Sequence, residues 1–372
     1  MARPIVGRVE PERSPGAPAT GQAAVPEPGT ARIAVDLLGG DHAPAVVVDG
    51  ALRACQADPA LQLLLVGPAE AAGAVISALE PADRARVSVI PAPAGRPGHH
   101  EKAPPEARPE KGPEERPENQ PEKRPARRPE QHPESWVESG VRAAVLAVAQ
   151  GHADGAVSAG NTGATVTSAA LGLGRWPGVR RPALAAVLPT ARGRLVLLDV
   201  GSSVDPDEQT LAMHAQLGAA YASVVLRVAA PKVGLLSIGT ERGKGDRLRR
   251  AAPGVLAGLA LPAGARYVGL IEGNDVVLGA AADVAVTDGF TGNVLLKGLE
   301  TAYAAIGPPG GETDHPPRAA ILLGVAGTIV VCHGAADAHD LAAGIAFAAD
   351  LHRRGAVAAI AGLIPYEVAH DQ

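Results

Sequence analysis

The stretch ARIAVDLLGGDHAPAVVVDGALRACQADPALQLLLV, residues 31–66, sets the fold class. It begins and ends with short apolar runs that predict buried strands over Arg32–Leu38 and Leu61–Val66. Between them, Val46–Cys55 has the apolar spacing of a helix, and a glycine pair separates this helix from the first strand. A strand, a helix and a strand in succession indicate the parallel unit of an α/β fold.

The same alternation continues along the chain. Further apolar runs predict strands at Gly155–Val157, Leu195–Val200, Lys232–Ile238, Val268–Ile271, Val284–Thr287 and Gly327–Cys332. Helical patterns lie between most of them, over Ser139–Gln150, Thr165–Leu173, Glu208–Val228, Gly292–Ile306 and Ala338–Arg354. We therefore expect a mostly parallel sheet covered by helices, with the active site beyond the carboxyl ends of the strands.

Two segments interrupt this pattern. Residues 1–30 are rich in Pro, Gly and Ala and predict a disordered extension. The second segment covers residues 91–133, where proline recurs at every fourth position from Pro105 onwards, a spacing that excludes a helix. It also has too few apolar residues to form a core. We expect one domain over residues 31–372 with a disordered insertion at 91–133. The insertion is either a docking or spacer segment or a tolerated loop expansion, since long insertions cost little loop entropy.

Composition excludes several classes of protein. The 372 residues carry 34 basic and 39 acidic side chains, and only two Trp, four Tyr and two Phe. This balance argues against a nucleic-acid partner, which needs basic and stacking surfaces. Two cysteines exclude a disulfide scaffold and fit a reducing compartment. With no signal-peptide pattern and no apolar run long enough for a membrane-spanning helix, we expect a cytoplasmic location.

Acidic and basic side chains follow the first predicted strand. Asp36, Asp41 and His42 stand around the glycine pair, where they supply acid, base or hydrogen-bonding groups. Helix capping explains Asp and His at such a position equally well. Polar side chains also stand beside glycines at later strand ends, namely Asp199, and Asp288 followed by Asn293.

The segment SAGNTGA, residues 158–164, follows a strand and opens a helix. Backbone N–H groups and small hydroxyls at a helix N-terminus hold anions, which makes this segment a candidate anion site. A simple N-cap at Asn161 or Thr162 is the alternative.

Two other segments carry reactive side chains. GTERGKG, residues 239–245, resembles a phosphate-binding Walker loop, but it has one residue too few between its glycines and Gly245 in the magnesium-binding position. A nucleotide triphosphatase is therefore disfavoured, while Lys244 is either a phosphate ligand or a solvated side chain. Cys332 precedes His333, but neighbours on a strand point to opposite faces, so we expect Cys332 to pack in the core. No Cys or His spacing predicts a metal site.

Taken in order, these segments resemble the phosphate acyltransferase family of bacterial phospholipid synthesis, the PlsX type. The resemblance covers roughly residues 31–90 and 135–350. The matching strings are IAVDLLGGDHAP, ADGAVSAGNTGA, GRWPGVRRPALAAVLPT, LLDVGSSVD, VGLLSIGTERGKGD, ADVAVTDGFTGNVLLKGLE and LLGVAGTIVVCHGAADA.

The resemblance implies a three-layer α/β/α fold related to phosphate acetyltransferases and isocitrate-type dehydrogenases. It also implies transfer of an acyl group from acyl-carrier protein to inorganic phosphate, without a cofactor, by direct attack. A homodimer and peripheral membrane contact are further family expectations. The expected phosphate ligands are Ser158, Asn161, Thr162, Gly163 and Lys244. The expected residues for positioning or proton transfer are Asp36, Asp41, His42, Asp199, Asp288, Asn293 and His333.

Three stretches differ from the family pattern. The proline repeat and PESWVES, residues 133–139, replace a basic stretch that contains serine, and Ser203 stands where Asn is usual. Only Thr301–Ala320 occupies the place of a helical excursion linked to dimer and membrane contacts. These differences keep open a catalytically impaired paralogue that binds acyl-carrier protein or an acyl ligand as a scaffold. A dehydrogenase or acetyltransferase is disfavoured because the first strand lacks a G-x-G-x-x-G turn.

Overall fold

The computed structural model describes four stretches of the chain, residues 29–92, 140–241, 243–309 and 318–365. The predicted N-terminal extension lies outside them except for its last two residues, and so does the predicted insertion from residue 93 onwards. Pro91, which the sequence assigned to the insertion, instead ends a strand and pairs with Gly67.

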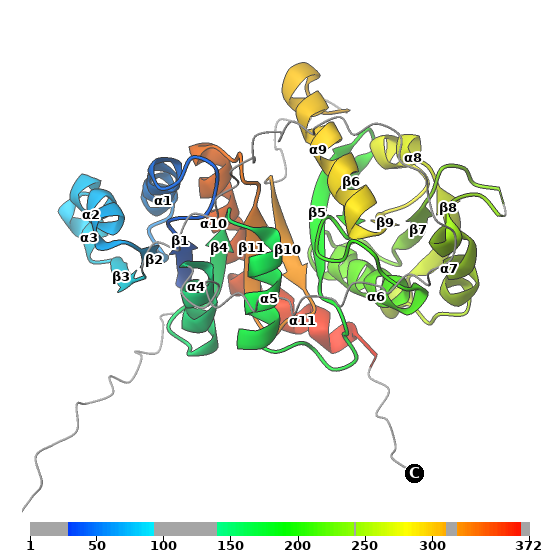
Figure 1. The fold of residues 1–372 in the computed structure, drawn as a ribbon, viewed down its shortest axis with the longest axis horizontal. Helices are drawn as coiled ribbons and strands as arrows, with labels where there is room; N and C mark the ends of the chain where they lie inside the picture. Colours follow the sequence, from blue (N-terminus) through cyan, green and yellow to red (C-terminus); the bar gives the residue numbers. More distant parts are fainter. Residues whose placement is uncertain (1–28, 93–139, 242, 310–317, 366–372) are drawn as a thin grey trace, which may run out of the picture.

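The described residues form one sheet of eleven strands in the order β3-β2-β1-β4-β11-β10-β5-β6-β9-β7-β8 (Figure 1). All the runs predicted as strands belong to it. The strands are β1 (Ala31–Asp36), β2 (Leu61–Gly67), β3 (Val87–Pro91), β4 (Gly155–Ser158), β5 (Ala183–Thr190), β6 (Gly193–Leu198), β7 (Lys232–Leu236), β8 (Arg266–Ile271), β9 (Val284–Val286), β10 (Ala319–Leu323) and β11 (Thr328–Cys332).

Helices cover both faces of this sheet, which confirms the expected α/β/α architecture. They are α1 (Ala45–Ala57), α2 (Ala69–Ala78), α3 (Pro81–Arg84), α4 (Gly140–Ala149), α5 (Thr162–Gly172), α6 (Glu208–Val224), α7 (Arg247–Ala257), α8 (Gly273–Leu278), α9 (Gly289–Ile306), α10 (Ala338–Arg353) and α11 (Ala356–Leu363). In Figure 1, α5 and α9 lie in front of the middle of the sheet, while α10 lies behind it.

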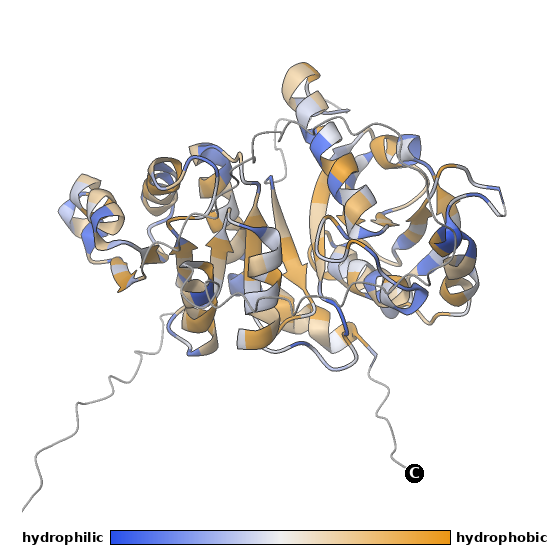
Figure 2. Cartoon of the chain, in the orientation of Figure 1, coloured by the Kyte–Doolittle hydropathy of each residue, from blue (hydrophilic) through white to orange (hydrophobic). Residues whose placement is uncertain are grey.

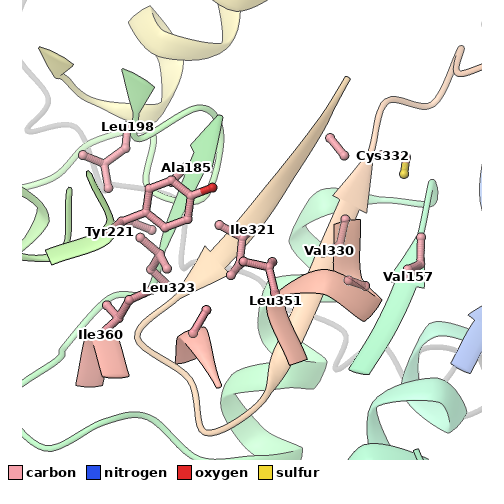
Figure 3. Packing of buried hydrophobic residues seen from close by; sticks show 14 of the residues in the cluster. Val157, Ala185, Leu198, Tyr221, Ile321, Leu323, Val330, Cys332, Leu351 and Ile360 are labelled. Carbon is pink, nitrogen blue, oxygen red and sulfur yellow. The ribbon is translucent and has the colours of Figure 1, made fainter. Parts of the chain in front are cut away.

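Each sheet face has its own apolar core, because successive side chains of a strand point to opposite faces. In β1, Ile33 and Val35 belong to a cluster with α1, α6 and α10, whereas Ala34 belongs to a second cluster with α4 and α9. Figure 3 shows part of the first cluster, where Ile321 of β10 and Val330 of β11 lie near Leu351 of α10. The hydropathy colouring of Figure 2 accordingly concentrates apolar residues in the strands.

The sheet consists of two parallel groups that run in opposite directions. One group is β1, β2, β3, β4 and β11, and the other is β6, β7, β8 and β9. Between them, β5 and β10 pair antiparallel with both of their neighbours, which reverses the direction. Strand-to-strand twist is roughly 20–25°, so the steps from β4 to β6 turn the strand direction by about 90°.

This turn brings strand-end loops of the two groups together. A Cβ built on Gly201, after β6, would lie 3.3 Å from Nδ2 of Asn293 and 3.9 Å from Cγ2 of Thr162, after β4. Loops that leave opposite ends of a flat sheet would be far apart. The twist therefore positions the site between the two groups.

Candidate active site

A cavity of about 560 Å³ lies between α5 and α9, on the sheet face that both helices cover. Its floor is apolar and consists mainly of alternate residues of β5, namely Leu184, Ala186 and Leu188, with Ala320 and Val331 beside them. Strand-end loops and α9 supply its polar groups. These are Asp41, Gly160, Thr162, Asn293, Lys297, Glu300, Arg318, His333 and Gly334.

Asp36 and Ser158 join the loops that follow β1 and β4. The Ser158 hydroxyl donates to Oδ2 of Asp36 at 2.8 Å and accepts from Gly160 N–H at 3.0 Å. A Cβ on Gly39 would lie 2.7 Å from the nitrogen of Gly160, so glycine is required for this close approach. Burial raises the pKa of Asp36, more than its hydrogen bonds lower it. Both side chains lie beneath the loops and do not line the cavity.

Asp41 lines the cavity, whereas its neighbour His42 does not. The Asp41 N–H donates to the Gly334 carbonyl at 2.8 Å, which ties the β1 loop to the loop after β11. The Asp41 side chain is exposed. The backbone of Asp41 is therefore held against the loop that contains His333, while its carboxylate stays exposed.

The N-terminus of α5 forms one wall of the cavity, through Gly160 and Thr162. Asn161 caps this helix, since its Oδ1 accepts from Ala164 N–H at 2.9 Å. The first N–H groups of a helix have no partner within it, and the helix dipole adds positive potential there. Gly163 is exposed and is not among the lining residues.

Asp199 organises the loop after β6. Its Oδ1 accepts from the N–H groups of Leu184, Gly201 and Ser202 at 3.0–3.1 Å, and its Oδ2 accepts from Ser203 N–H at 2.5 Å. The carboxylate is completely buried. With its acceptor positions occupied by backbone, Asp199 shapes the loop and does not face the cavity.

Asp288 caps α9 and pairs with a buried arginine that the sequence did not single out. Its Oδ1 accepts from Thr291 N–H at 2.8 Å, and its Oδ2 accepts from Arg249. Arg249 also donates to the Leu236 carbonyl, to Asp246 and to Thr287. Burial acts to raise the pKa of Asp288, but the hydrogen bonds from Thr291 and Arg249 outweigh it and lower the pKa.

Asn293, Lys297 and Glu300 follow one another along the cavity side of α9, at the helical spacing of three and four residues. Asn293 Nδ2 donates to the Val200 carbonyl at 3.0 Å, which fixes the helix against the β6 loop. Burial raises the pKa of Glu300, although the charge of Arg318 opposes this. Helical spacing from Asn293 was the signal in the sequence from which Lys297 could have been found.

His333 lines the cavity and carries a buried ring nitrogen. Its Nδ1 accepts from Ala335 N–H at 3.3 Å, so the neutral ring carries its proton on Nε2. Nε2 is buried, and among the described residues it has no hydrogen-bond partner. Burial, together with the nearby charges of Lys297 and Arg318, lowers the pKa of His333 and favours this neutral form.

Neither Cys332 nor Lys244 contributes a polar side chain to the cavity, although Cys332 is one of its lining residues. The Cys332 thiol packs against α10, where a Cβ on Gly344 would lie 2.4 Å from its Sγ, and burial raises its pKa to about 12. Figure 3 shows this thiol within the apolar cluster. Lys244 is exposed in the loop before α7 and does not line the cavity.

The structure thus divides the residues proposed from the sequence into three sets. Asp41, Thr162, Asn293 and His333 meet at the cavity. Buried side chains that hold the loops are Asp36, Ser158, Asp199 and Asp288. Exposed residues outside the lining are His42, Asn161, Gly163 and Lys244. In the described ranges, no three His, Cys, Asp or Glu side chains gather as a metal ion would require.

Sequence comparison identifies relatives over most of the chain. The family described as "Fatty acid synthesis protein" matches residues 31–95 and 127–308. A phosphate acyltransferase of Thermobifida fusca is 36% identical over 336 residues, which cover 83% of this chain and 84% of that protein. A phosphate acyltransferase of Heliobacterium modesticaldum is 32% identical, over 91% of this chain and 98% of that protein.

Solved structures share the fold at low sequence identity. The branched-chain phosphotransacylase of Enterococcus faecalis superposes with a TM-score of 0.53 at 14% identity, over 87% of this chain and 99% of its own. The EutD phosphotransacetylase of Staphylococcus aureus gives a TM-score of 0.52 at 17% identity, over 90% and 96% of the two chains. At these identities the similarity shows the fold alone.

Proposed function

This chain belongs to the phosphate acyltransferase family, a family of transferases in fatty acid synthesis, and we propose that it transfers an acyl group from the thioester of acyl-carrier protein to inorganic phosphate. The observation that carries this proposal is the cavity, which combines a helix N-terminus with an apolar floor. A helix N-terminus suits an anion, and an apolar floor suits an acyl chain. Acyl phosphate and free carrier protein are the products.

Phosphate binds between the start of α5 and the facing side of α9. Thr162 brings a backbone N–H group and a hydroxyl from one side, beside Gly160, whose own N–H is bound to Ser158. Lys297 brings a positive charge from the other side, and Asn293 lies one helical turn before it. This assignment gives Lys297 the charge-neutralising role that the sequence suggested for Lys244.

The reaction proceeds by direct attack. A phosphate oxygen forms a bond to the thioester carbonyl carbon, and the carbonyl electrons move to the oxygen. When this tetrahedral oxyanion collapses, the carbon–sulfur bond breaks, and the carrier thiolate leaves with the electron pair and takes up, through solvent, the proton that the hydrogen phosphate gives up. The Nε2–H of His333 donates a hydrogen bond to the oxyanion. A deeply buried Cys332 with a raised pKa supports this route over a covalent intermediate on that thiol.

The proposed partners are acyl-carrier protein, which family membership supports, and phosphate, which the helix N-terminus at the cavity supports. Within the residues that the structure describes, no helix has the length and apolar character to span a membrane. Phe290 and Val294 expose 63% and 58% of their surface on α9, and exposed apolar side chains of this kind mark interaction surfaces. A homodimer stays a prediction. Peripheral membrane contact and a cytoplasmic location stay predictions.

An activity assay tests the proposal. The purified chain is incubated with an acyl-carrier protein thioester, with and without phosphate, and free carrier thiol is measured with a thiol reagent. We expect thiol release that saturates with phosphate, and acyl phosphate that hydroxylamine converts to a hydroxamate. Binding of the carrier protein without release of thiol would contradict the transfer and favour the scaffold alternative.

A further inference from the structure

We propose that Tyr303 sets the length of the acyl chain that the cavity accepts, an inference that rests on the transfer proposed above. Tyr303 lines the cavity on α9, and its hydroxyl donates to the carbonyl oxygen of Pro189 on β5 at 3.3 Å. The ring therefore reaches from one wall to the strand that forms the floor. An extended chain that lies along this floor meets the ring.

Three hydrogen bonds show that α9 follows β5 along the cavity. Asn293 contacts the Val200 carbonyl, and Val200 N–H donates to the Leu184 carbonyl at 3.0 Å, so Asn293 lies near the start of β5. Tyr303 contacts Pro189, near the end of the same strand. From Asn293 to Tyr303 the helix rises by about 15 Å. From Leu184 to Pro189 the strand extends by about 17 Å, which agrees with the helix.

The two ends of this path carry different groups. Near Asn293 lie the α5 N-terminus and Thr162, where phosphate is placed. At the other end, Tyr303 contacts Pro189 and the lining includes Pro308, while Glu300 lies one helical turn before Tyr303. We therefore place the phosphate of an acyl phosphate at α5 and its chain along the apolar floor of β5, directed toward Tyr303.

Tyrosine is suited to end this path. The aromatic ring has few rotatable bonds, and the hydroxyl finds a hydrogen-bond partner while the ring body stays apolar. The ring is half-buried, and burial raises the pKa of its hydroxyl, so the hydroxyl keeps the proton that it donates. Removing the ring would extend the apolar path, whereas removing only the hydroxyl would leave the obstruction.

The test uses straight-chain alkyl phosphonates of increasing length, which carry an anion and a chain as the product does, and calorimetry on the full chain. For the wild type, we expect affinity to increase with each methylene until the chain reaches Tyr303, and then to stop increasing. In Tyr303→Ala the increase should continue to longer chains, with at least about a tenfold gain for the first length beyond the wild-type limit. Tyr303→Phe should keep the wild-type limit, and Tyr303→Trp should shorten it.

Thr301→Ala is the matched control on the same helix, because Thr301 is exposed and its hydroxyl bonds to the Lys297 carbonyl of its own helix. This control should keep the wild-type limit. An unchanged limit in Tyr303→Ala, or affinity that does not depend on length in the wild type, would overturn the inference. Because the assay measures binding, it decides on Tyr303 even if the transfer of acyl groups to phosphate fails.

Discussion

His333 lines the cavity, its Nδ1 accepts one hydrogen bond, and the proposed reaction uses its Nε2, which has no hydrogen-bond partner among the described residues. We predict that His333→Ala lowers kcat by about 10²–10³-fold, the usual cost of one oxyanion donor. Steady-state kinetics with saturating phosphate measure this effect. A loss confined to KM for phosphate would instead place His333 in ground-state binding.

Lys297 and Lys244 provide a direct comparison between the structure and the sequence pattern. Lys297 lines the cavity, whereas Lys244 is exposed in a glycine-rich loop outside the lining. We predict that Lys297→Ala raises KM for phosphate by about tenfold or more, since one charge-assisted contact contributes roughly 1.5–3 kcal/mol. The matched measurement is the turnover of Lys244→Ala at subsaturating phosphate, which we expect to be close to that of the wild type. A larger effect of Lys244→Ala than of Lys297→Ala would mean that Lys244 provides the positive charge that neutralises phosphate.

At the scale of residues, the sequence could identify strand-end positions but not the direction of each side chain. Asp36 and Asp41 belong to the same loop, yet Asp36 is buried and accepts a hydrogen bond from Ser158, whereas Asp41 lines the cavity. The distinction depends on Gly39 and Gly334, which allow neighbouring loops to approach. The direction of each side chain is decided by contacts between loops that are distant in sequence, and a local sequence pattern does not reveal such contacts.

At the scale of elements, Arg249 connects α7 to the beginning of α9. It pairs with Asp288, and both side chains are at least nine-tenths buried. We predict that Arg249→Met lowers the free energy of unfolding by about 3–5 kcal/mol, because it leaves the Asp288 carboxylate buried without its partner. Urea unfolding measures this loss.

The adjacent Arg250 is the control for this prediction, since it lies exposed on the same helix. Arg250→Met should change stability by no more than about 0.5 kcal/mol. Asp288→Asn added to Arg249→Met should recover part of the loss, because it removes the unpaired charge. Similar small effects of both arginine substitutions would contradict the predicted role of the buried pair.

The sequence pattern did not predict β5, and the reason lies in the composition of this strand. β5 contains Ala183, Ala185, Ala186 and Pro189, residues that do not favour strands. Its central position in the sheet comes from burial between β6 and β10, and Pro189 lies beyond the residues that pair with β10.

At the scale of the whole molecule, buried histidine couples stability to pH. His214 is fully buried on α6, and burial lowers its pKa against the opposing charge of Asp199. The unfolded chain therefore binds a proton more readily than the folded protein below the ordinary value of 6.5. We predict that this group removes up to about 1.4 kcal/mol of stability per pH unit as pH falls below that value.

The variant His214→Leu checks this prediction, because it cannot take up the proton. Its stability should depend less steeply on pH below 6.5 than that of the wild type, measured by urea unfolding at several pH values. His152→Ala, which changes an exposed histidine, should keep the wild-type slope. Equal slopes for His214→Leu and the wild type would assign the pH dependence to other groups.

The path of the chain through the sheet also determines when folding can finish during synthesis. The first group of strands is complete only when β11 pairs with β4 and α10 packs on α1, although more than 150 residues separate β4 from β11. Until then, β4 has an open edge available to other chains. A nascent chain stopped after α9 should therefore aggregate, which sedimentation can show, because a segment synthesised later protects the edge of a strand synthesised much earlier.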